Sequence, residues 1–316
     1  MGYRFVTMAL KSVLITGCSA GGIGSALVDA FQKQNMLVYA TARDPSKMSH
    51  LKEIPNVKLL TLEPTSVTSV RAAVDFVDAQ TGGTLDYLVN NAGQTIIMPT
   101  LDFDIETAKG MYEINVWGMV RVTQAFAPLA IEAKGIIANI NSISTHVNTP
   151  WMGEFSKPTP VAVAMLTDAL GLYAGSKAAA DAITETLRLE TAPFDVKVVN
   201  TVTGAISTNI LSSGVNFELP RTSRYKNIEK DISARAGGED GTPRMEPSLF
   251  AEKVVGDIPG GANRHIWRGG YASIVRYTSY WFPFSLAVSR ARSCSNAYMG
   301  DLMMATRTTC LSKELA

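Results

Sequence analysis

Short runs of β-branched and aliphatic residues alternate with helix-like segments along most of the chain. The runs are too short for helices, and glycines or polar residues bound them, so each predicts a buried strand. The expected strands are Ser12–Thr16, Met36–Arg43, Val57–Leu62, Leu85–Val89, Ile136–Ile140 and Val196–Val202. The expected helices are Ser25–Gln34, Val67–Gln80, Glu106–Lys134, Tyr173 to about Glu190, and Pro247–Ile258.

Strands that alternate with helices favour a parallel sheet with helices on both faces. We therefore expect one α/β domain over residues 1–316, a doubly wound sheet of the Rossmann type. Its core covers about residues 10–260, and a C-terminal extension that closes over the substrate covers about 261–316. Ligands of such sheets bind at the carboxyl ends of the strands.

A glycine-rich turn, Gly17–Gly24, lies between the first expected strand and the first expected helix. Strand, turn and helix in this order place a pyrophosphate at the helix N-terminus. Glycines suit the turn because a side chain would hold the phosphates away from the main-chain N–H groups. The turn therefore predicts a dinucleotide site.

The end of the second expected strand indicates which dinucleotide binds. Ala42 stands where a carboxylate would accept hydrogen bonds from the adenosine ribose, and Arg43 follows it. A guanidinium at this place can bind a 2′-phosphate, which favours NADP(H) over NADH. The alternative is that Arg43 starts a solvated loop and that Asp44 binds the ribose.

Tyr173 and Lys177 are four residues apart at the start of an expected helix. Residues at this spacing share a helix face, so the phenol and the ammonium point into the same space. An ammonium near a phenol lowers the pKa of the tyrosine, which prepares it for proton transfer. The pair predicts acid–base chemistry only in combination with the other motifs, because the same spacing occurs often on solvated helices.

Taken together, these motifs resemble those of the short-chain dehydrogenase/reductases over about residues 10 to 260. The likeness rests on Thr16-Gly17, Gly22-Ile23-Gly24, Asn90-Asn91-Ala92-Gly93, Asn115, Ser142 and the pair Tyr173 and Lys177, which occur in the family's order. The glycine turn is one residue longer than the commonest form. With Tyr39–Arg43 and Trp267–Gly270, it is similar to that of the fungal NADPH-dependent 1-acyldihydroxyacetone phosphate reductases. That group merges into reductases of secondary metabolism, so the substrate does not transfer with the likeness.

The resemblance implies a role for each residue of the catalytic set. Tyr173 would protonate the carbonyl oxygen as a hydride arrives from the nicotinamide, and Ser142 would hydrogen-bond the same oxygen. Lys177 would bind the nicotinamide ribose and hold down the pKa of Tyr173, and Asn115 would fix a water that links Lys177 to solvent. The implied cofactor-binding residues are Thr16, Gly17, Ser19, Gly22, Ile23, Gly24, Arg43, Glu63, Asn91, Ala92, Gly93, Tyr173, Lys177, Ala205 and Thr208.

Two features depart from the family. Glu63-Pro64 replaces an aspartate and a valine at the adenine edge, and proline has no N–H to offer. Ser142 and Tyr173 are 31 positions apart, where the family has a short loop. Residues 154–171 account for the excess, either as a lid over the substrate or as a translated intron, and we weigh these two hypotheses evenly.

The segment from Thr208 to about Met245 is expected to close over the substrate. Its basic residues favour either an anionic substrate or, more simply, a solvated face; they are Arg221, Arg224, Lys226 and Lys230. The aromatic segment Tyr277–Phe284 could line an apolar pocket, touch lipid or pack in the core.

Composition argues against nucleic acid as a partner, against a disulfide framework and against a metal site. The chain has 316 residues and a net charge of +1, which gives no reason to expect nucleic acid. Its cysteines, Cys18, Cys294 and Cys310, are odd in number and far apart, which favours a reducing compartment over a disulfide framework. The histidines are scattered, so we expect no metal site.

We expect a cytoplasmic location. Met1–Lys11 lacks the long apolar stretch of a signal peptide, and no apolar run reaches the roughly 18–20 residues that span a bilayer. Peripheral contact with the endoplasmic reticulum or a lipid droplet through the C-terminal region stays open, as does a homo-oligomer.

The sequence therefore predicts an NADP(H)-dependent oxidoreductase that interconverts a ketone and an alcohol of a lipid-like or secondary-metabolite substrate. The sequence does not indicate whether reduction or oxidation is the physiological direction, because the same proton donor serves both reactions. The alternative from another class is a nucleotide-sensing or scaffold protein that keeps the dinucleotide site without turnover.

Overall fold

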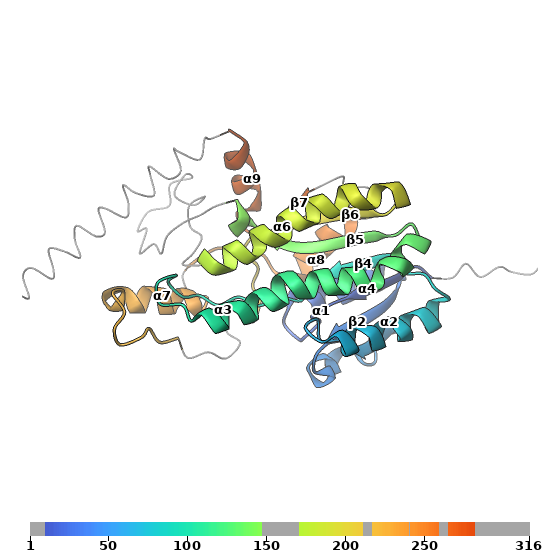
Figure 1. The fold of residues 1–316 in the computed structure, drawn as a ribbon, viewed down its shortest axis with the longest axis horizontal. Coiled ribbons are helices and arrows are strands. Elements are labelled where there is room, and N and C mark those ends of the chain that lie inside the picture. Colours follow the sequence, from blue (N-terminus) through green and yellow to red (C-terminus); the bar gives the residue numbers. More distant parts are fainter. Residues whose placement is uncertain (1–9, 147–170, 211–216, 240, 259–264, 282–316) are drawn as a thin grey trace, which may run out of the picture.

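A parallel sheet of seven strands forms the centre of the described part of the chain, which comprises residues 10–146, 171–210, 217–239, 241–258 and 265–281 of a computed structural model (Figure 1). Its order is β3-β2-β1-β4-β5-β6-β7, and every neighbouring pair is parallel. The strands are β1 (Ser12–Ile15), β2 (Leu37–Ala42), β3 (Val57–Thr61), β4 (Tyr87–Asn90), β5 (Ile136–Ser142), β6 (Lys197–Thr203) and β7 (His265–Arg268).

Helices cover both faces of the sheet. One layer comprises α1 (Ile23–Lys33) and α8 (Pro247–Asp257). The other layer comprises α2 (Val67–Thr81), α4 (Met119–Glu132) and α6 (Gly171–Thr191), and it lies in front of the sheet in Figure 1. The remaining elements are η1 (Pro45–Leu51), α3 (Ile105–Tyr112), the π-helical turn η2 (Glu113–Gly118), η3 (Ile143–Thr145), η4 (Ala192–Phe194), η5 (Lys226–Ile228), α7 (Glu229–Ala236) and α9 (Ala272–Trp281).

The two apolar cores lie on opposite faces of the sheet because side chains alternate along each strand. In β1 the side chains of Val13 and Ile15 enter the core under α1 and α8, whereas Leu14 enters the core under α2 and α4. All four residues of β1 are buried. A central parallel strand is covered on both faces, which explains why its sequence is a continuous apolar run and not an alternating one.

The expected doubly wound parallel sheet is confirmed, and several elements differ in detail, including the helices α7 and α9, which were not expected. The segment expected as one helix over Glu106–Lys134 is interrupted by the π-helical turn η2. A further strand, β7, pairs with β6 at the edge of the sheet. Its four residues lie in a stretch for which the sequence predicted neither strand nor helix, since an edge strand this short leaves little periodicity to read.

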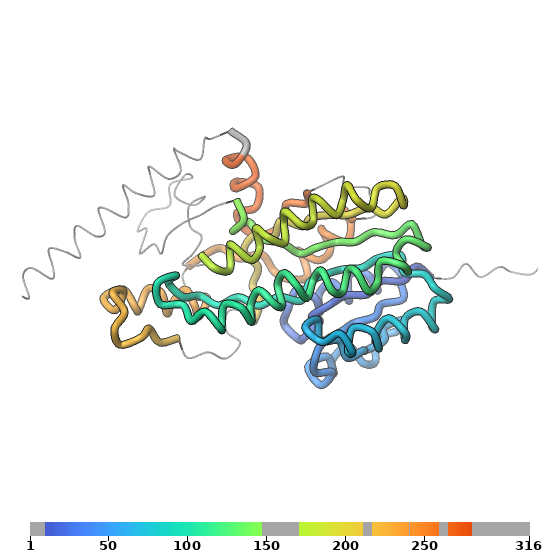
Figure 2. The backbone as a smooth tube through the Cα atoms, viewed as in Figure 1, coloured from blue at the N-terminus to red at the C-terminus, as the bar shows by residue number. Residues whose placement is uncertain are grey.

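Segments far apart in the sequence meet beyond the carboxyl end of the sheet. Figure 2 shows residues 217–239, in orange, beside the chain that leads into α3. Ile97 of that chain packs with Leu219 and Ile232, and the Ser223 hydroxyl donates to the Asp102 carboxylate at 2.6 Å. The segment after β6 therefore lies against the chain that leads into α3, and closure over a substrate stays a prediction.

Most of the expected insertion, residues 154–171, lies outside the described residues, as do Phe282–Phe284 of the aromatic segment and most of the C-terminal extension. Tyr277, the first residue of the aromatic segment, lies on α9 and is 65% exposed. Within the described ranges, no helix combines the length and apolarity needed to cross a bilayer.

Candidate active site

The expected site residues meet at one edge of the sheet, where the parallel strands end. The glycine turn follows β1, Asn91 follows β4, Ser142 is the last residue of β5, and Ala205 comes shortly after β6. Carboxyl ends of parallel strands share one edge, and in open α/β sheets this edge is where ligands bind.

The glycine turn is closely packed against the end of β4. Gly17 has a φ of +75°, and a Cβ added to it would lie 2.9 Å from the Cα of Ala92. A Cβ on Gly24 would lie 2.3 Å from the carbonyl oxygen of Gly17 and 2.6 Å from Nδ2 of Asn91. Glycine is therefore required at both positions, which the sequence pattern anticipated for phosphate approach but not for this internal packing.

Cys18 holds the turn to its neighbours through two hydrogen bonds. Cys18 is buried, its N–H donates to the carbonyl oxygen of Thr41 at 2.8 Å, and its thiol donates to the carbonyl oxygen of Ile15 at 3.2 Å. Burial raises the pKa of this thiol to about 12, so the thiol stays protonated and unreactive at neutral pH. Cys18 therefore anchors the turn, and the half-buried Ser19 follows it at the mouth.

The N-terminus of α1 offers its main-chain N–H groups to a ligand. Gly22 is the N-cap, no side chain of the described residues caps it, and Ile23 begins the helix. The first N–H groups of a helix lack internal partners and, together with the helix dipole, favour an anion. A glycine cradle beside an uncapped helix N-terminus fits the pyrophosphate of a dinucleotide.

Thr16 connects the glycine turn to the segment after β4. Its Oγ1 accepts hydrogen bonds from the main-chain N–H groups of Asn91 and Ala92, both at 2.9 Å. The Asn91 amide donates to the carbonyl oxygens of Thr16 and Gly17, at 2.8 and 3.0 Å. These expected cofactor residues therefore form one hydrogen-bonded unit, which fixes the glycine turn relative to the segment after β4.

At the end of β2, Arg43 is exposed, whereas the Asp44 carboxylate is engaged in its own turn. Asp44 accepts hydrogen bonds from the N–H and the hydroxyl of Ser46, at 3.0 and 2.7 Å. Those bonds lower the pKa of Asp44. The carboxylate is thus directed toward η1, and both bonds end on its Oδ1.

Glu63, the expected adenine-edge residue, is half-buried and held locally. Its carboxylate accepts from the Thr65 hydroxyl at 3.0 Å, and its N–H donates to the Ser69 hydroxyl at 3.0 Å. The adjacent Pro64 is fixed from α4, because Arg121 donates to its carbonyl oxygen at 2.7 Å. The segment Glu63-Pro64, where the sequence departs from the family, is therefore held in place at this side of the site.

Ser142 and Tyr173 meet across the site despite the 31 positions between them. Their hydroxyl groups are hydrogen-bonded to each other. Burial raises the pKa of Tyr173 to about 12, and the bond from Ser142 acts in the opposite direction. The prediction that the pKa of Tyr173 lies below its usual value is wrong for this structure, because desolvation of the phenolate dominates.

Lys177 lies one turn after Tyr173 in α6, with 8% of its surface exposed. Its Nζ donates to the carbonyl oxygen of Ile140 at 2.8 Å. Burial lowers the pKa of Lys177 to about 8. A Cβ on Gly93 would lie 3.3 Å from Oδ1 of Asn115 and 3.7 Å from this Nζ, so Gly93 packs directly beside both side chains.

Asn115 lies in the π-helical turn η2 and is 2% exposed. Its Oδ1 accepts from the N–H of Gln94 at 2.8 Å, and its Nδ2 donates to the Gln94 carbonyl oxygen at 2.9 Å and to the Ser176 hydroxyl at 3.0 Å. The side chain thus joins the segment after β4 to α6. Single π turns are frequent at functional sites, and the helical periodicity of the sequence did not indicate this one.

The expected residues after β6 are held by a turn that the sequence did not single out for this purpose. Ala205 exchanges two hydrogen bonds with Gly270, both at 3.0 Å, and accepts a third from Met245. Thr208 is half-buried, and the N–H of the next residue, Asn209, donates to the carbonyl oxygen of Gly21 at 3.4 Å. The chain after β6 therefore lies across the glycine turn.

Apolar side chains surround the Tyr173 ring. One cluster contains Ile97, Leu219, Ile228 and Ile232, and a second contains Phe103, Ala108 and Met111; Met98 and Tyr173 contact both. Of the basic residues in the covering segment, Lys226 pairs with Glu229 at 2.8 Å, and Arg221, Arg224 and Lys230 are exposed. The basic residues thus belong to a solvated face, and the wall beside Tyr173 is apolar.

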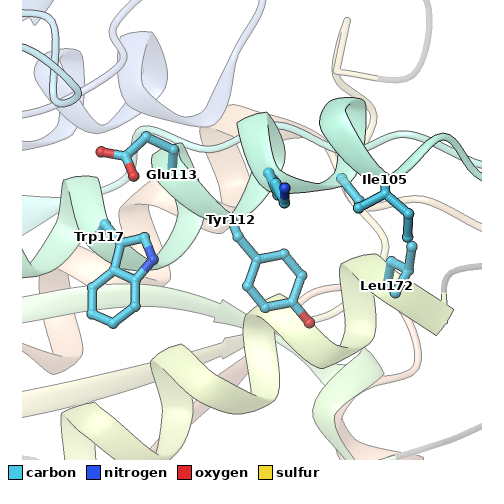
Figure 3. Close-up of a pocket in the computed structure, with 7 residues that line it drawn as sticks. Ile105, Tyr112, Glu113, Trp117 and Leu172 are labelled. Carbon is cyan, nitrogen blue, oxygen red and sulfur yellow. The ribbon is translucent and has the colours of Figure 1, made fainter.

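The start of α6 is also packed closely against α3. Tyr112 extends toward α6 in Figure 3, and a Cβ on Gly175 would lie 2.5 Å from its hydroxyl oxygen. On the outer side of this contact, a groove is lined by Ile105, Ala108, Lys109, Tyr112, Glu113, Trp117 and Leu172. Glycine between Tyr173 and Lys177 therefore lets α3 approach the helix that carries both residues.

Comparison with known proteins gives one consistent result. The family model described as short chain dehydrogenase matches residues 11–172. The short-chain dehydrogenase PC-15 of Penicillium crustosum is 42% identical over 274 residues, which cover 87% of this chain and 92% of that protein. The NADPH-dependent 1-acyldihydroxyacetone phosphate reductase of Schizosaccharomyces pombe is 39% identical over 289 residues, which cover 90% of each chain.

Solved structures share the fold at lower identity. A short chain dehydrogenase from Burkholderia cenocepacia in complex with NADP has a TM-score of 0.67 at 23% identity, and the match covers 89% of this chain and 98% of that one. A short chain dehydrogenase/reductase from Burkholderia phymatum in complex with NAD has a TM-score of 0.64 at 18% identity, over 81% of this chain and 88% of that one. Both dinucleotides therefore occur among proteins with this fold.

Proposed function

The chain belongs to the short-chain dehydrogenase/reductase family, and from this premise we propose that it is an NADPH-dependent reductase that converts a ketone to an alcohol. The observation that carries the proposal is the hydrogen bond between the Ser142 and Tyr173 hydroxyls. The Lys177 ammonium lies one turn further along the helix that carries Tyr173. A phenol bonded to a second hydroxyl at the ligand-binding edge of the sheet, with an ammonium one helical turn further on, can deliver a proton to a carbonyl oxygen.

NADPH, when bound, supplies the hydride. The glycine turn and the N-terminus of α1 would hold its pyrophosphate, and Lys177 its nicotinamide ribose. Arg43 would bind the 2′-phosphate, a role supported by the engagement of the Asp44 carboxylate with Ser46. The printed name of the Schizosaccharomyces pombe relative, an NADPH-dependent reductase, supports the same choice.

The hydroxyl groups act on the substrate oxygen. Because the pKa of Tyr173 is about 12, its phenol is protonated at neutral pH and can donate to a carbonyl that gains negative charge. Ser142 can donate a hydrogen bond either to this oxygen or to the phenolate that remains after proton transfer. The Lys177 ammonium, which is charged below a pH of about 8, favours that phenolate electrostatically.

The substrate we propose is a ketone that carries large apolar groups, of a lipid-like or secondary-metabolite kind. The apolar clusters on either side of Tyr173 support this class, since they offer dispersion contacts and no charge partner for an anion. Pairing of Lys226 with Glu229 supports it further.

Oxidation of NADPH with a panel of ketones tests the proposal. The purified chain is mixed with NADPH, binding is followed by nicotinamide fluorescence, and turnover by the decrease in absorbance. We expect turnover with ketones that carry long or polycyclic apolar groups. Binding without turnover on any ketone would instead indicate a nucleotide-sensing protein that keeps the dinucleotide site.

A further inference from the structure

A second serine lies behind the catalytic hydroxyls. Ser144 is in the short turn η3 directly after β5, and 3% of its surface is exposed. Its hydroxyl donates to Oγ of Ser142 at 3.0 Å, and its main-chain N–H donates to the same oxygen at 3.2 Å. Ser142 Oγ therefore receives two hydrogen bonds from one residue.

The hydrogen-bonding capacity of a hydroxyl limits what Ser142 can do next. A serine hydroxyl has two lone pairs and one hydrogen. Ser144 occupies both lone pairs, so the contact between Ser142 and Tyr173 must use the hydrogen of Ser142, with the phenol oxygen as acceptor. The hydrogen of Tyr173 is then left for another acceptor.

We propose that Ser144 is a positioning residue that fixes the direction of the Ser142 hydroxyl and so keeps the Tyr173 hydrogen directed at the substrate. This inference rests on the proposed reductase function. Without the Ser144 hydroxyl, a lone pair of Ser142 becomes available, and the phenol can donate to Ser142 in place of the carbonyl. The phenolate formed by proton transfer also loses a donor that Ser144 had polarised.

If Ser144 had a purely structural role, its hydroxyl would be needed to hold the turn η3, but other bonds hold this turn. The N–H bond of Ser144 already caps η3, and that bond persists in any variant at this position. The neighbouring Thr145 hydroxyl donates to the main-chain carbonyl of Ser142 at 2.9 Å, which holds the turn without touching Oγ. Thr145 therefore offers a matched control. Its hydroxyl is one residue away and stabilises the same turn, but it does not affect which way the hydrogen bond between Ser142 and Tyr173 is directed.

The experiment compares Ser144→Ala, Ser144→Thr and Thr145→Val in the full chain, with NADPH and a ketone that the wild type reduces. For Ser144→Ala we expect kcat to fall about tenfold, the Kd for NADPH to stay unchanged, and the solvent deuterium isotope effect on kcat to increase, since proton transfer becomes harder. Ser144→Thr should recover most of kcat because it restores a hydroxyl. Thr145→Val should keep kcat and the isotope effect of the wild type.

Several outcomes overturn the positioning role. These are an unchanged kcat and isotope effect in Ser144→Ala, or a loss of kcat in Thr145→Val as large as that in Ser144→Ala. Should Ser144→Thr not fold, Ser144→Cys replaces it, and a kcat no higher than that of Ser144→Ala contradicts the inference, because a thiol is still a weak donor. A wild type that binds NADPH but reduces no ketone overturns the proposed function and the positioning role with it, whereas loss of the positioning role alone leaves wild-type turnover intact.

Discussion

The Lys177 ammonium on α6 donates a hydrogen bond of 2.8 Å to the carbonyl oxygen of Ile140 in β5. This bond ties the helix that carries Tyr173 to the strand that ends in Ser142, so it fixes the two hydroxyls relative to each other. A single main-chain carbonyl does not compensate the loss of hydration of a buried charge, and the pKa of Lys177 falls to about 8.

We predict that kcat/KM for NADPH falls as the pH rises through about 8, because Lys177 then loses its proton and with it the charge that favours the Tyr173 phenolate. Below this pH the ammonium is protonated and the rate is highest. An ordinary lysine would move the decline to above pH 10. Initial rates between pH 6 and about 9.5 check the prediction, and a rate that stays level over this whole range contradicts it.

Tyr173→Phe removes the hydroxyl and keeps the ring in its apolar surroundings. We expect turnover to fall by about a thousandfold, in the range that general acid catalysis supplies, with the NADPH affinity nearly unchanged. Stopped assays of the reaction and fluorescence titration with NADPH separate the two effects. A variant that keeps the full rate would contradict the mechanism, because the phenol that is bonded to Ser142 would then be dispensable.

Arg43→Ala tests which dinucleotide the site prefers. Loss of a charge-assisted contact with the 2′-phosphate should weaken NADPH at least about tenfold and leave NADH nearly unchanged. Lys47→Ala, which removes another exposed cation in η1, serves as the control for general electrostatic attraction. Equal weakening of NADPH and NADH would mean that the 2′-phosphate is bound by other residues.

Gly24→Ala tests the packing of the glycine turn. The added Cβ would lie 2.3 Å from the Gly17 carbonyl oxygen, a distance that forces the turn and the end of β1 apart. We expect a lower Tm and weaker NADPH binding. Gly256→Ala is the matched control: a Cβ there meets nothing within 4 Å, so alanine should stabilise α8 by about 0.5–1 kcal/mol. Thermal unfolding of both variants decides, and a Gly24→Ala protein as stable as Gly256→Ala refutes the packing argument.

The sequence predicted the sheet, and it predicted which motifs gather at the carboxyl edge of the sheet, because both depend on local patterns. Apolar runs such as Val13–Ile15 mark buried strands, and glycines such as Gly17 mark a turn that side chains cannot enter. Quantities that depend on tertiary surroundings were not predictable in the same way. The pKa of Tyr173 is raised and not lowered, because the apolar clusters from two distant segments surround its ring.

Residues that act through others were also missed. Ser144 and Ser176 carry no motif of their own, and their importance follows only from the atoms they contact, Ser142 and Asn115. The seventh strand, β7, is four residues long, and its register with β6 is set by pairing and not by its own composition. Local sequence therefore indicates which residues gather at this edge of the sheet, and tertiary contacts determine their protonation and orientation.

Asn115 is expected to serve the site first as a structural link. The buried amide makes three hydrogen bonds, two with the main chain of Gln94 and one with the Ser176 hydroxyl. Asn115→Leu would remove all three bonds and leave the buried Ser176 hydroxyl without this partner, at a cost of about 1–3 kcal/mol in the free energy of unfolding. Ser176→Ala removes only one of the bonds and should cost about 1 kcal/mol. Urea unfolding of both variants measures the difference. If Asn115→Leu is as stable as the wild type while kcat collapses, the residue acts instead through a bound water near Lys177, as the family resemblance implied, and the structural link is secondary.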